Sequence, residues 1–98
     1  MKTLKLKERT LKTLNNKMNL MGFRQPIDEE IAPSVYELTY TNKWDKNHVV
    51  TIQYDGDDNV LSIKLFTVAT PLGMELYINK ETWKNILSCI ATFQILAA

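Results

Sequence analysis

Two side chains of this sequence could form a nucleophile–base pair. His48 is the only histidine and Cys89 is the only cysteine. A catalytic thiol needs a neighbouring base or positive charge that holds it as the thiolate, and no nucleophile motif surrounds either residue. His48 is interpreted as an exposed residue at the start of a strand, and Cys89 as a small apolar residue within a helix. We therefore expect no catalytic residues and no cofactor, and an enzyme is the least favoured class.

The acidic run from Asp55 to Asn59 resembles a calcium-binding loop. An EF-hand loop places a glutamate at its twelfth position, and counting from Asp55 that position holds Phe66. The spacing excludes an EF-hand, and we predict no metal site. Weak cation binding by Asp55, Asp57 and Asp58 is the alternative to a solvated turn whose residues serve backbone geometry.

Charge is unevenly distributed, although the whole chain carries only +1. Residues 1–24 contain seven basic side chains and one acidic side chain, a net charge of +6, whereas residues 25–98 contain five and ten, a net charge of −5. Lys5, Arg9 and Lys12 follow helical spacing and form a basic stripe. The stripe has three interpretations: a solvated face that pairs with the acidic body, a contact for an acidic protein, and a contact for nucleic-acid phosphates. A membrane contact is less favoured, because the apolar stripe of the same helix lacks Trp and Phe.

Trp44 lies in the polar turn at residues 42–47, where a large aromatic side chain is uncommon. It is interpreted either as a lid over the sheet edge or as an exposed anchor for a partner. The predicted partner-binding residues are therefore the basic stripe, Trp44 and the acidic turn: Lys5, Arg9, Lys12, Trp44, Asp55, Asp57 and Asp58.

The basic stripe requires a helix over residues 1–22. Apolar residues recur at spacings of seven, three, four and three, which predicts one buried face; they are Leu4, Leu11, Leu14, Met18 and Met21. Gly22 suits the left-handed residue that ends a helix, Phe23 follows as its apolar partner, and Pro26 prevents continuation. Residues 25–34 are predicted to be a connector with room for one turn of helix, in which Ile27 and Ile31 would contact the core.

Four alternating segments predict a sheet over residues 35–78, with strands near 35–41, 49–54, 60–66 and 72–78. Each has an apolar face and a polar face, which is typical of an antiparallel meander with one solvated side. An even loop between the second and third strands, or an odd loop with a bulge, would place Val50, Ile52 and Tyr54 on the same face as Leu61, Ile63 and Leu65.

A last helix is predicted over residues 80–96, with Asn79 as its N-cap. Both helices should cover the apolar sheet face, so the expected fold is a single α+β domain over residues 1–98. It is a two-layer sandwich in which a four-stranded antiparallel meander carries its N-terminal and C-terminal helices on one face (α-β-β-β-β-α).

Composition favours a small intracellular protein. A single cysteine indicates a reducing, cytoplasmic location, and no apolar run reaches the roughly 18 residues of a membrane span. Lysine outnumbers arginine ten to two, a bias typical of AT-rich coding, as in low-GC bacteria and their phages. We predict a non-enzymatic protein-binding module, an inhibitor, adaptor or regulator, that acts through charged surfaces. The alternative is a nucleic-acid-binding module. A homodimer is also expected to be open to this chain, through the apolar second half of the helix at 80–96 or through the solvated sheet face.

Overall fold

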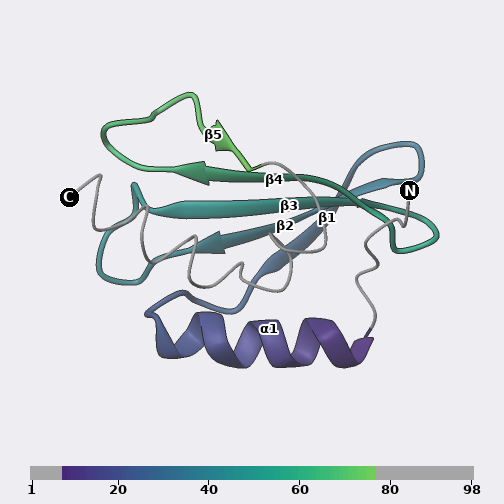
Figure 1. Cartoon of the computed structure of the whole chain (residues 1–98), viewed down its shortest axis with the longest axis horizontal. Coiled ribbons are helices and arrows are strands. Elements are labelled where there is room, and N and C mark those ends of the chain that lie inside the picture. The colour runs from purple at the N-terminus through teal and green to yellow at the C-terminus, as the bar shows by residue number, and fades with distance from the viewer. Residues whose placement is uncertain (1–7, 77–98) are drawn as a thin grey trace.

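The computed structural model describes residues 8–76, which form one helix against one face of an antiparallel sheet (Figure 1). The elements are α1 (Glu8–Leu20), β1 (Ile27–Ala32), β2 (Val35–Thr41), β3 (Val49–Asp55), β4 (Val60–Phe66) and β5 (Met74–Glu75). The strands lie in the order β1-β2-β3-β4-β5, so the sheet is a meander. The predicted α+β architecture is confirmed for these residues. The predicted helix at 80–96 lies outside the described residues, as do residues 77 and 78 of the last predicted strand.

The C-terminal end of α1 is the one predicted from the sequence. Gly22 has a φ of 92°, the left-handed conformation that glycine adopts without a steric penalty. The N–H of Phe23 donates to the carbonyl of Met18, and that of Gly22 to the carbonyl of Asn19, both at 3.0 Å. This pair of bonds is the Schellman motif. It turns the chain back so that Phe23 enters the core.

The core lies between α1 and the sheet. Leu14 and Met18 of α1 are buried, which agrees with the predicted apolar stripe. They belong to one cluster with Phe23 and the inward side chains of the three central strands: Leu38, Tyr40, Val50, Ile52, Val60, Ile63 and Leu65. Alternation along β2, β3 and β4 therefore places the apolar residues on the α1 side, as the sequence predicts.

The connector prediction for residues 25–34 was wrong, because this segment contains β1. It pairs with β2 in antiparallel register, with Asp28 opposite Leu38 and Glu30 opposite Tyr36. All six residues of β1 are exposed, and Ile27 is 66% exposed, so it does not contact the core as expected. The strand is held by main-chain pairing and buries no apolar stripe, so hydrophobic periodicity gave no signal for it.

The β3–β4 hairpin has an odd loop corrected by a bulge, one of the two predicted solutions. Asp55 N–H donates to the carbonyl of Asn59 at 3.0 Å, and Asp58 has a φ of 65°. The register then shifts, so that Tyr54 faces Val60 while Gln53 faces Ser62. As a result Val60 is buried, and the prediction that Leu61 lies on the core face was wrong: Leu61 is 46% exposed.

The last strand is shorter than predicted. β5 contains two residues, with Met74 opposite Leu65 and Glu75 opposite Lys64. Leu72, expected at the start of this strand on the apolar face, lies before it and is 92% exposed. Gly73, with a φ of 86°, turns the chain into β5 against the ring of Phe66.

Candidate functional site

The predicted acidic turn lies at the tip of the β3–β4 hairpin, where Asp55 shapes the turn. Its Oδ1 accepts from the N–H groups of Asp57 and Asn59, both at 2.9 Å, and its Oδ2 accepts from the Asn59 amide at 3.0 Å. Asp57 and Asp58 are exposed. In the described part of the chain, no group of three or more His, Cys, Asp or Glu residues has a metal-binding arrangement.

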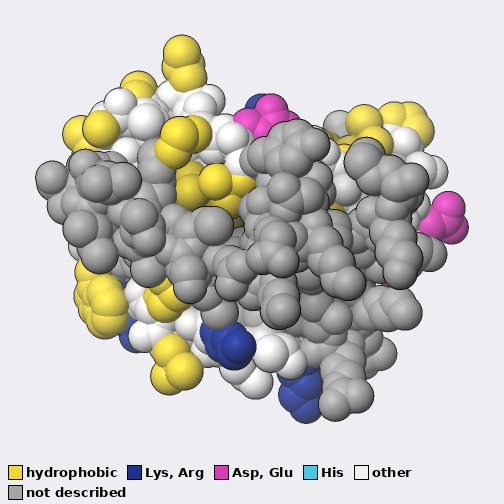
Figure 2. All heavy atoms as spheres, in the orientation of Figure 1, with side chains coloured by type: hydrophobic (Ala, Val, Ile, Leu, Met, Phe, Trp, Pro, Cys, Tyr) yellow, Lys and Arg dark blue, Asp and Glu magenta, His cyan; other side chains and the backbone are white. Residues whose placement is uncertain are grey.

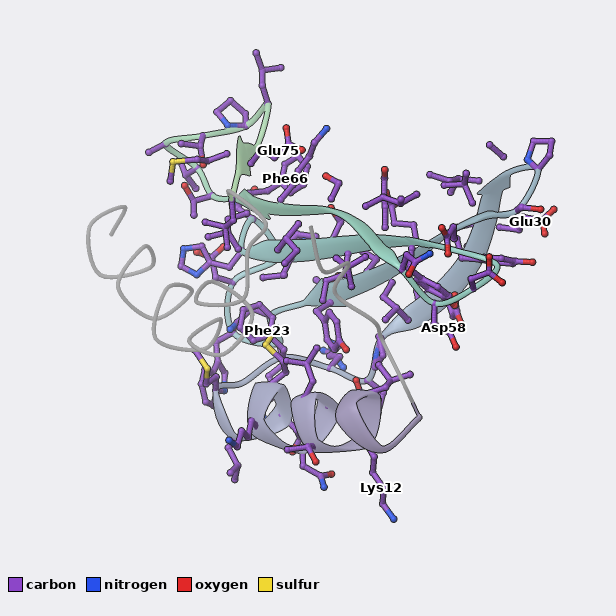
Figure 3. The ribbon with its side chains drawn as sticks, turned by 45° about the vertical axis from the view of Figure 1, so that its right-hand side comes forward. Lys12, Phe23, Glu30, Asp58, Phe66 and Glu75 are labelled. Carbon is purple, nitrogen blue, oxygen red and sulfur yellow. The ribbon has the colours of Figure 1, made fainter. Side chains whose placement is uncertain are left out.

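The described part of the basic stripe faces away from the sheet. Lys12 is exposed and points away from the rest of the molecule (Figure 3). Arg9 lies in the first turn of α1, whereas Lys5 lies outside the described residues. Within residues 11–76, neither Lys12 nor Lys17 forms an ion pair with a carboxylate. The three interpretations of the basic stripe therefore stay predictions.

Trp44 lies at the end of the sheet where β2 turns into β3, and its side chain is 75% exposed. Asn42 Oδ1 accepts from the N–H groups of Trp44 and Asp45, which fixes the turn. The Trp44 ring lies over Gly22, so closely that a Cβ at Gly22 would overlap the ring. Lys43 Nζ is 5.1 Å from the ring centroid, in cation–π geometry.

Basic residues occur in the segments that flank Trp44 and in the end of α1. Arg24 N–H donates to the Thr41 carbonyl at 2.9 Å and Lys43 N–H to the Gly22 carbonyl at 2.8 Å, so the end of α1 runs beside the β2–β3 turn. This places Lys17, Arg24, Lys43 and Lys46 near one end of the sheet. All four are exposed.

The opposite end of the sheet carries a cluster that was not predicted, made of two tyrosines and two carboxylates. Tyr36 and Tyr54 stack at the end of the core-side face, with ring centroids 5.3 Å apart. The Tyr54 hydroxyl donates to the carboxylate of Asp28, at 2.6 Å from Oδ2 and 2.8 Å from Oδ1. Glu30 lies directly opposite Tyr36 across the β1–β2 pair. We call Asp28, Glu30, Tyr36 and Tyr54 the tyrosine–carboxylate cluster.

The pKa values of these phenols reflect the surrounding charge. A hydrogen bond to Glu30, together with the charge of that carboxylate, raises the pKa of Tyr36. Burial raises the pKa of Tyr54, and the hydrogen bond to Asp28 and the charges of Asp28 and Asp58 raise it further. Both hydroxyls therefore stay protonated at neutral pH and can donate hydrogen bonds.

The acidic residues of β1 and of the hairpin tip meet at this same end of the molecule. Glu30 and Asp58 both lie at this end, away from the side on which Lys12 lies (Figure 3). In Figure 2 most of the visible Lys and Arg side chains lie over α1, whereas Asp and Glu lie at the upper and right-hand edges. We call this region, which comprises the tyrosine–carboxylate cluster together with Glu29, Asp55, Asp57 and Asp58, the acidic end.

Part of the acidic charge lies on the face of the sheet opposite the core. Glu29 is directly opposite Glu37 in the β1–β2 register, so two carboxylates face one another there. Like charges in such a cross-strand pair are destabilising. The Gln53 amide donates to Glu37 Oε2 at 3.0 Å. This bond satisfies part of the hydrogen-bonding capacity of the Glu37 carboxylate but does not neutralise its charge.

The solvated face also contains a shallow hollow of about 510 Å³ at the other end of the sheet. Phe66, Val49 and Pro71 form its apolar wall, and Glu37, Thr39 and Lys46 supply polar groups. Phe66 therefore lines a hollow and is half-buried. His48 Nε2 lies 3.6 Å from Asp45 Oδ2 in the adjoining turn, and Cys89 lies outside the described residues.

Sequence reasoning identified the hairpin tip but missed the rest of the acidic end. The signal was present in the run Asp28-Glu29-Glu30, which was assigned to a connector. Recognising that these residues pair with the strand at 35–41 would have brought them beside Tyr36 and Tyr54.

Comparisons of the chain with protein-family models, with curated proteins and with solved structures found no match. Among the described residues, no helix has the length and apolar character needed to span a membrane.

Proposed function

We propose that this chain is a small protein-binding module that contacts a basic surface of its partner through the acidic end. It acts without catalysis, as an inhibitor, adaptor or regulator, in the cytoplasm. The observation that carries the proposal is the tyrosine–carboxylate cluster, in which Tyr54 donates to Asp28 and stacks on Tyr36. Tyrosine is enriched among the residues that dominate binding energies at protein interfaces.

The surroundings of the cluster support this proposal. Exposed carboxylates at the hairpin tip extend the negative surface, and they steer a basic partner towards it. Ile27 and Ile31 of β1 itself supply exposed apolar area, with Ile27 on the solvated face beside Glu29. An interface of this composition combines aromatic and apolar contact with a charged rim.

The exposure of the carboxylates supports binding over catalysis. Asp28, Glu29 and Glu30 are exposed side chains on an edge strand, which suits them to attract a cationic surface.

Affinity capture from the cells that encode the chain tests the proposal with three full-length baits. The first is the unaltered chain, the second carries Asp28→Asn, Glu30→Gln and Asp57→Asn, and the third carries Lys12→Gln and Lys17→Gln. We expect a basic protein that the first and third baits retain and the second loses, with retention falling as salt increases. A partner that all three baits retain equally, or that only the third bait loses, would contradict the proposal.

A second candidate function is the binding of single-stranded nucleic acid at the opposite end of the sheet. The observation that favours it is the exposed ring of Trp44 among basic side chains, since stacking and phosphate contacts together bind single strands. Titration with single- and double-stranded oligonucleotides over a salt series tests it. A steep salt dependence that Trp44→Ala and Lys43→Gln reduce would support this function, and flat curves at low salt would eliminate it.

A further inference from the structure

Within residues 8–76, β1 forms one edge of the sheet and has β2 as its neighbour on one side only. All six of its residues are exposed. In an antiparallel edge strand, alternate residues direct their N–H and C=O groups outward, where another strand can pair with them. At the other edge β5 offers only two residues, so β1 is the longer pairing surface.

The side chains of β1 place carboxylates on both faces of this edge. Asp28 and Glu30 lie on the core-side face, because their partners in β2 are Leu38 and Tyr36. Glu29 lies on the solvated face opposite Glu37. A strand added beside β1 would therefore have negative charge next to its side chains on either face.

The negative charge of β1 indicates whether the added strand comes from a second copy of this chain or from a different protein. Pairing of β1 with β1 of a second copy would set the run Asp28-Glu29-Glu30 against the same run. Like charges directly opposite destabilise a strand pair, and natural proteins use charged edges to prevent self-pairing. A strand that carries lysine or arginine would instead gain opposite-charge pairs, and it would relieve the repulsion between Glu29 and Glu37.

We propose that β1 accepts an extended basic segment of the partner by strand addition, with Lys or Arg side chains beside Glu29 on one face and beside Asp28 and Glu30 on the other. This inference rests on the proposed function and specifies its partner. Pro26 and Pro33 flank the strand and the register shifts between Glu30 and Ala32. The regular pairing surface is therefore short, and the segment that it accepts is about as long as a typical strand, roughly six residues.

The test uses the full chain and a synthetic lysine–valine peptide of about six residues, in which adjacent lysines place positive charge on both faces of the added strand. The control peptide has the same sequence with every backbone nitrogen methylated, which keeps each charge and removes each main-chain donor. Binding is measured by titration calorimetry at low and moderate salt. We expect the first peptide to bind and the methylated peptide to bind at least roughly tenfold more weakly, since the ladder hydrogen bonds supply much of the affinity in strand addition.

Two double variants of the chain test where the peptide binds. Asp28→Asn with Glu30→Gln removes two charges from β1, and Asp57→Asn with Asp58→Asn removes two charges from the neighbouring hairpin tip. We expect the β1 variant to weaken peptide binding by roughly fivefold or more and the tip variant to weaken it less. A tip variant with the same or a larger effect would overturn the assignment to β1.

The remaining outcomes separate this inference from the proposed function. Equal affinity for both peptides would overturn strand addition, while charge-driven binding at the acidic end would survive. If neither peptide binds at low salt, the inference is wrong, and the three-bait capture decides the proposed function independently. If light scattering shows that the unaltered chain is a dimer without peptide and that Ile27→Lys makes it a monomer, the occupant is a second copy and our choice is overturned.

Discussion

The hydroxyl of Tyr54 reaches across β2 to the carboxylate of Asp28, so one hydrogen bond joins β3 to β1. Its ring stacks on Tyr36 of the strand between them. Tyr40 continues the same face into the core, where it is fully buried and its hydroxyl donates to Asn15 of α1. Three tyrosines therefore line the core-side face from its exposed end to its centre. Each hydroxyl must be neutral to donate its hydrogen bond.

These phenols predict how stability changes at alkaline pH. Burial, and then the charge of Asp28, raise the pKa of Tyr40 above 10.0, and the pKa values of Tyr36 and Tyr54 are raised as well. Below pH 10.0 the tyrosines are protonated in the folded and in the unfolded chain, and their full contribution to the free energy of unfolding is present. Above it the unfolded chain loses protons first, so the free energy of unfolding falls as pH rises.

Phenolate absorbance and circular dichroism, followed together from neutral to alkaline pH, check this prediction. We expect most phenolate to form as the ellipticity is lost, and Tyr40→Phe to make the decline of stability above pH 10.0 shallower. Native ellipticity with all tyrosines ionised at their ordinary pKa would contradict it.

Gly22 allows a second prediction at the scale of one residue. Its φ of 92° and the Trp44 ring above it leave no room for a side chain. Gly22→Ala should lower the free energy of unfolding by roughly 1–2 kcal/mol from backbone strain alone, with a further loss if the Trp44 ring must move. Gly56→Ala is the matched control, because a Cβ at Gly56 meets nothing within 4 Å and its φ is not positive.

Urea denaturation of the two glycine variants gives the comparison. Repeating Gly22→Ala in a Trp44→Ala background separates the strain of the backbone from the contact with the ring. Equal stabilities for the Gly22 and Gly56 variants would contradict the helix end described above.

Among the elements, the β3–β4 hairpin has a register that substitution can test directly. The bulge buries Val60 and exposes Leu61. Val60→Ala should cost about 2 kcal/mol of unfolding free energy, whereas Leu61→Ala should cost about 0.5 kcal/mol or less. Leu61, the larger residue, should therefore contribute less to stability than Val60. Thermal or urea unfolding in which Leu61→Ala costs more than Val60→Ala would indicate an even loop without the bulge.

The pair formed by Glu29 and Glu37 predicts a gain of stability on removing a charge. Glu29→Gln ends the repulsion across β1 and β2, so the free energy of unfolding should rise by roughly 0.2–1 kcal/mol, most clearly at low salt. Glu75→Gln is the matched control, because Glu75 faces Lys64 and its neutralisation should give no gain. Denaturation at two salt concentrations measures both, and a loss of stability in the Glu29 variant would contradict the cross-strand repulsion.

Elements with a buried face could be predicted from the sequence, and elements without one could not. β2, β3 and β4 alternate apolar and polar residues because they cover the core, and the end of α1 carries its glycine signal. β1 has no such constraint, since in the part of the chain that the structure describes it pairs only with β2 and all six of its residues are exposed. Val60 and Leu61 are both apolar, so the pattern could not show which of them the bulge turns inward.

The acidic end was unpredictable for the same reason. Its members come from β1, β2, β3 and the hairpin tip, and only the meander with β1 at its edge brings them together. Local charge runs were visible in the sequence, but the pairing of Tyr36 and Tyr54 with Asp28 and Glu30 depends on strand register. The hairpin tip was recognised because its residues are contiguous.

At the scale of the whole molecule, the fold converts a charge difference along the sequence into a difference between two regions. Basic residues lie on α1 and around Trp44, and most of the described acidic residues lie at the opposite end of the sheet. Such a molecule is oriented by the field of a charged partner before contact, which raises association rates in a salt-dependent way. The proposed function therefore depends on which of the two regions contacts the partner.

Mapping by nuclear magnetic resonance tests most directly whether the acidic end is the binding surface. The isotope-labelled full chain is titrated with the lysine–valine peptide and, separately, with a single-stranded oligonucleotide, and amide shifts are followed residue by residue. We predict that the peptide shifts the amides of β1 and of Tyr36 and Tyr54, while the oligonucleotide leaves them unchanged. Peptide shifts that are absent from β1, or confined to α1 and the turn that holds Trp44, would contradict the claim that the acidic end is the binding surface.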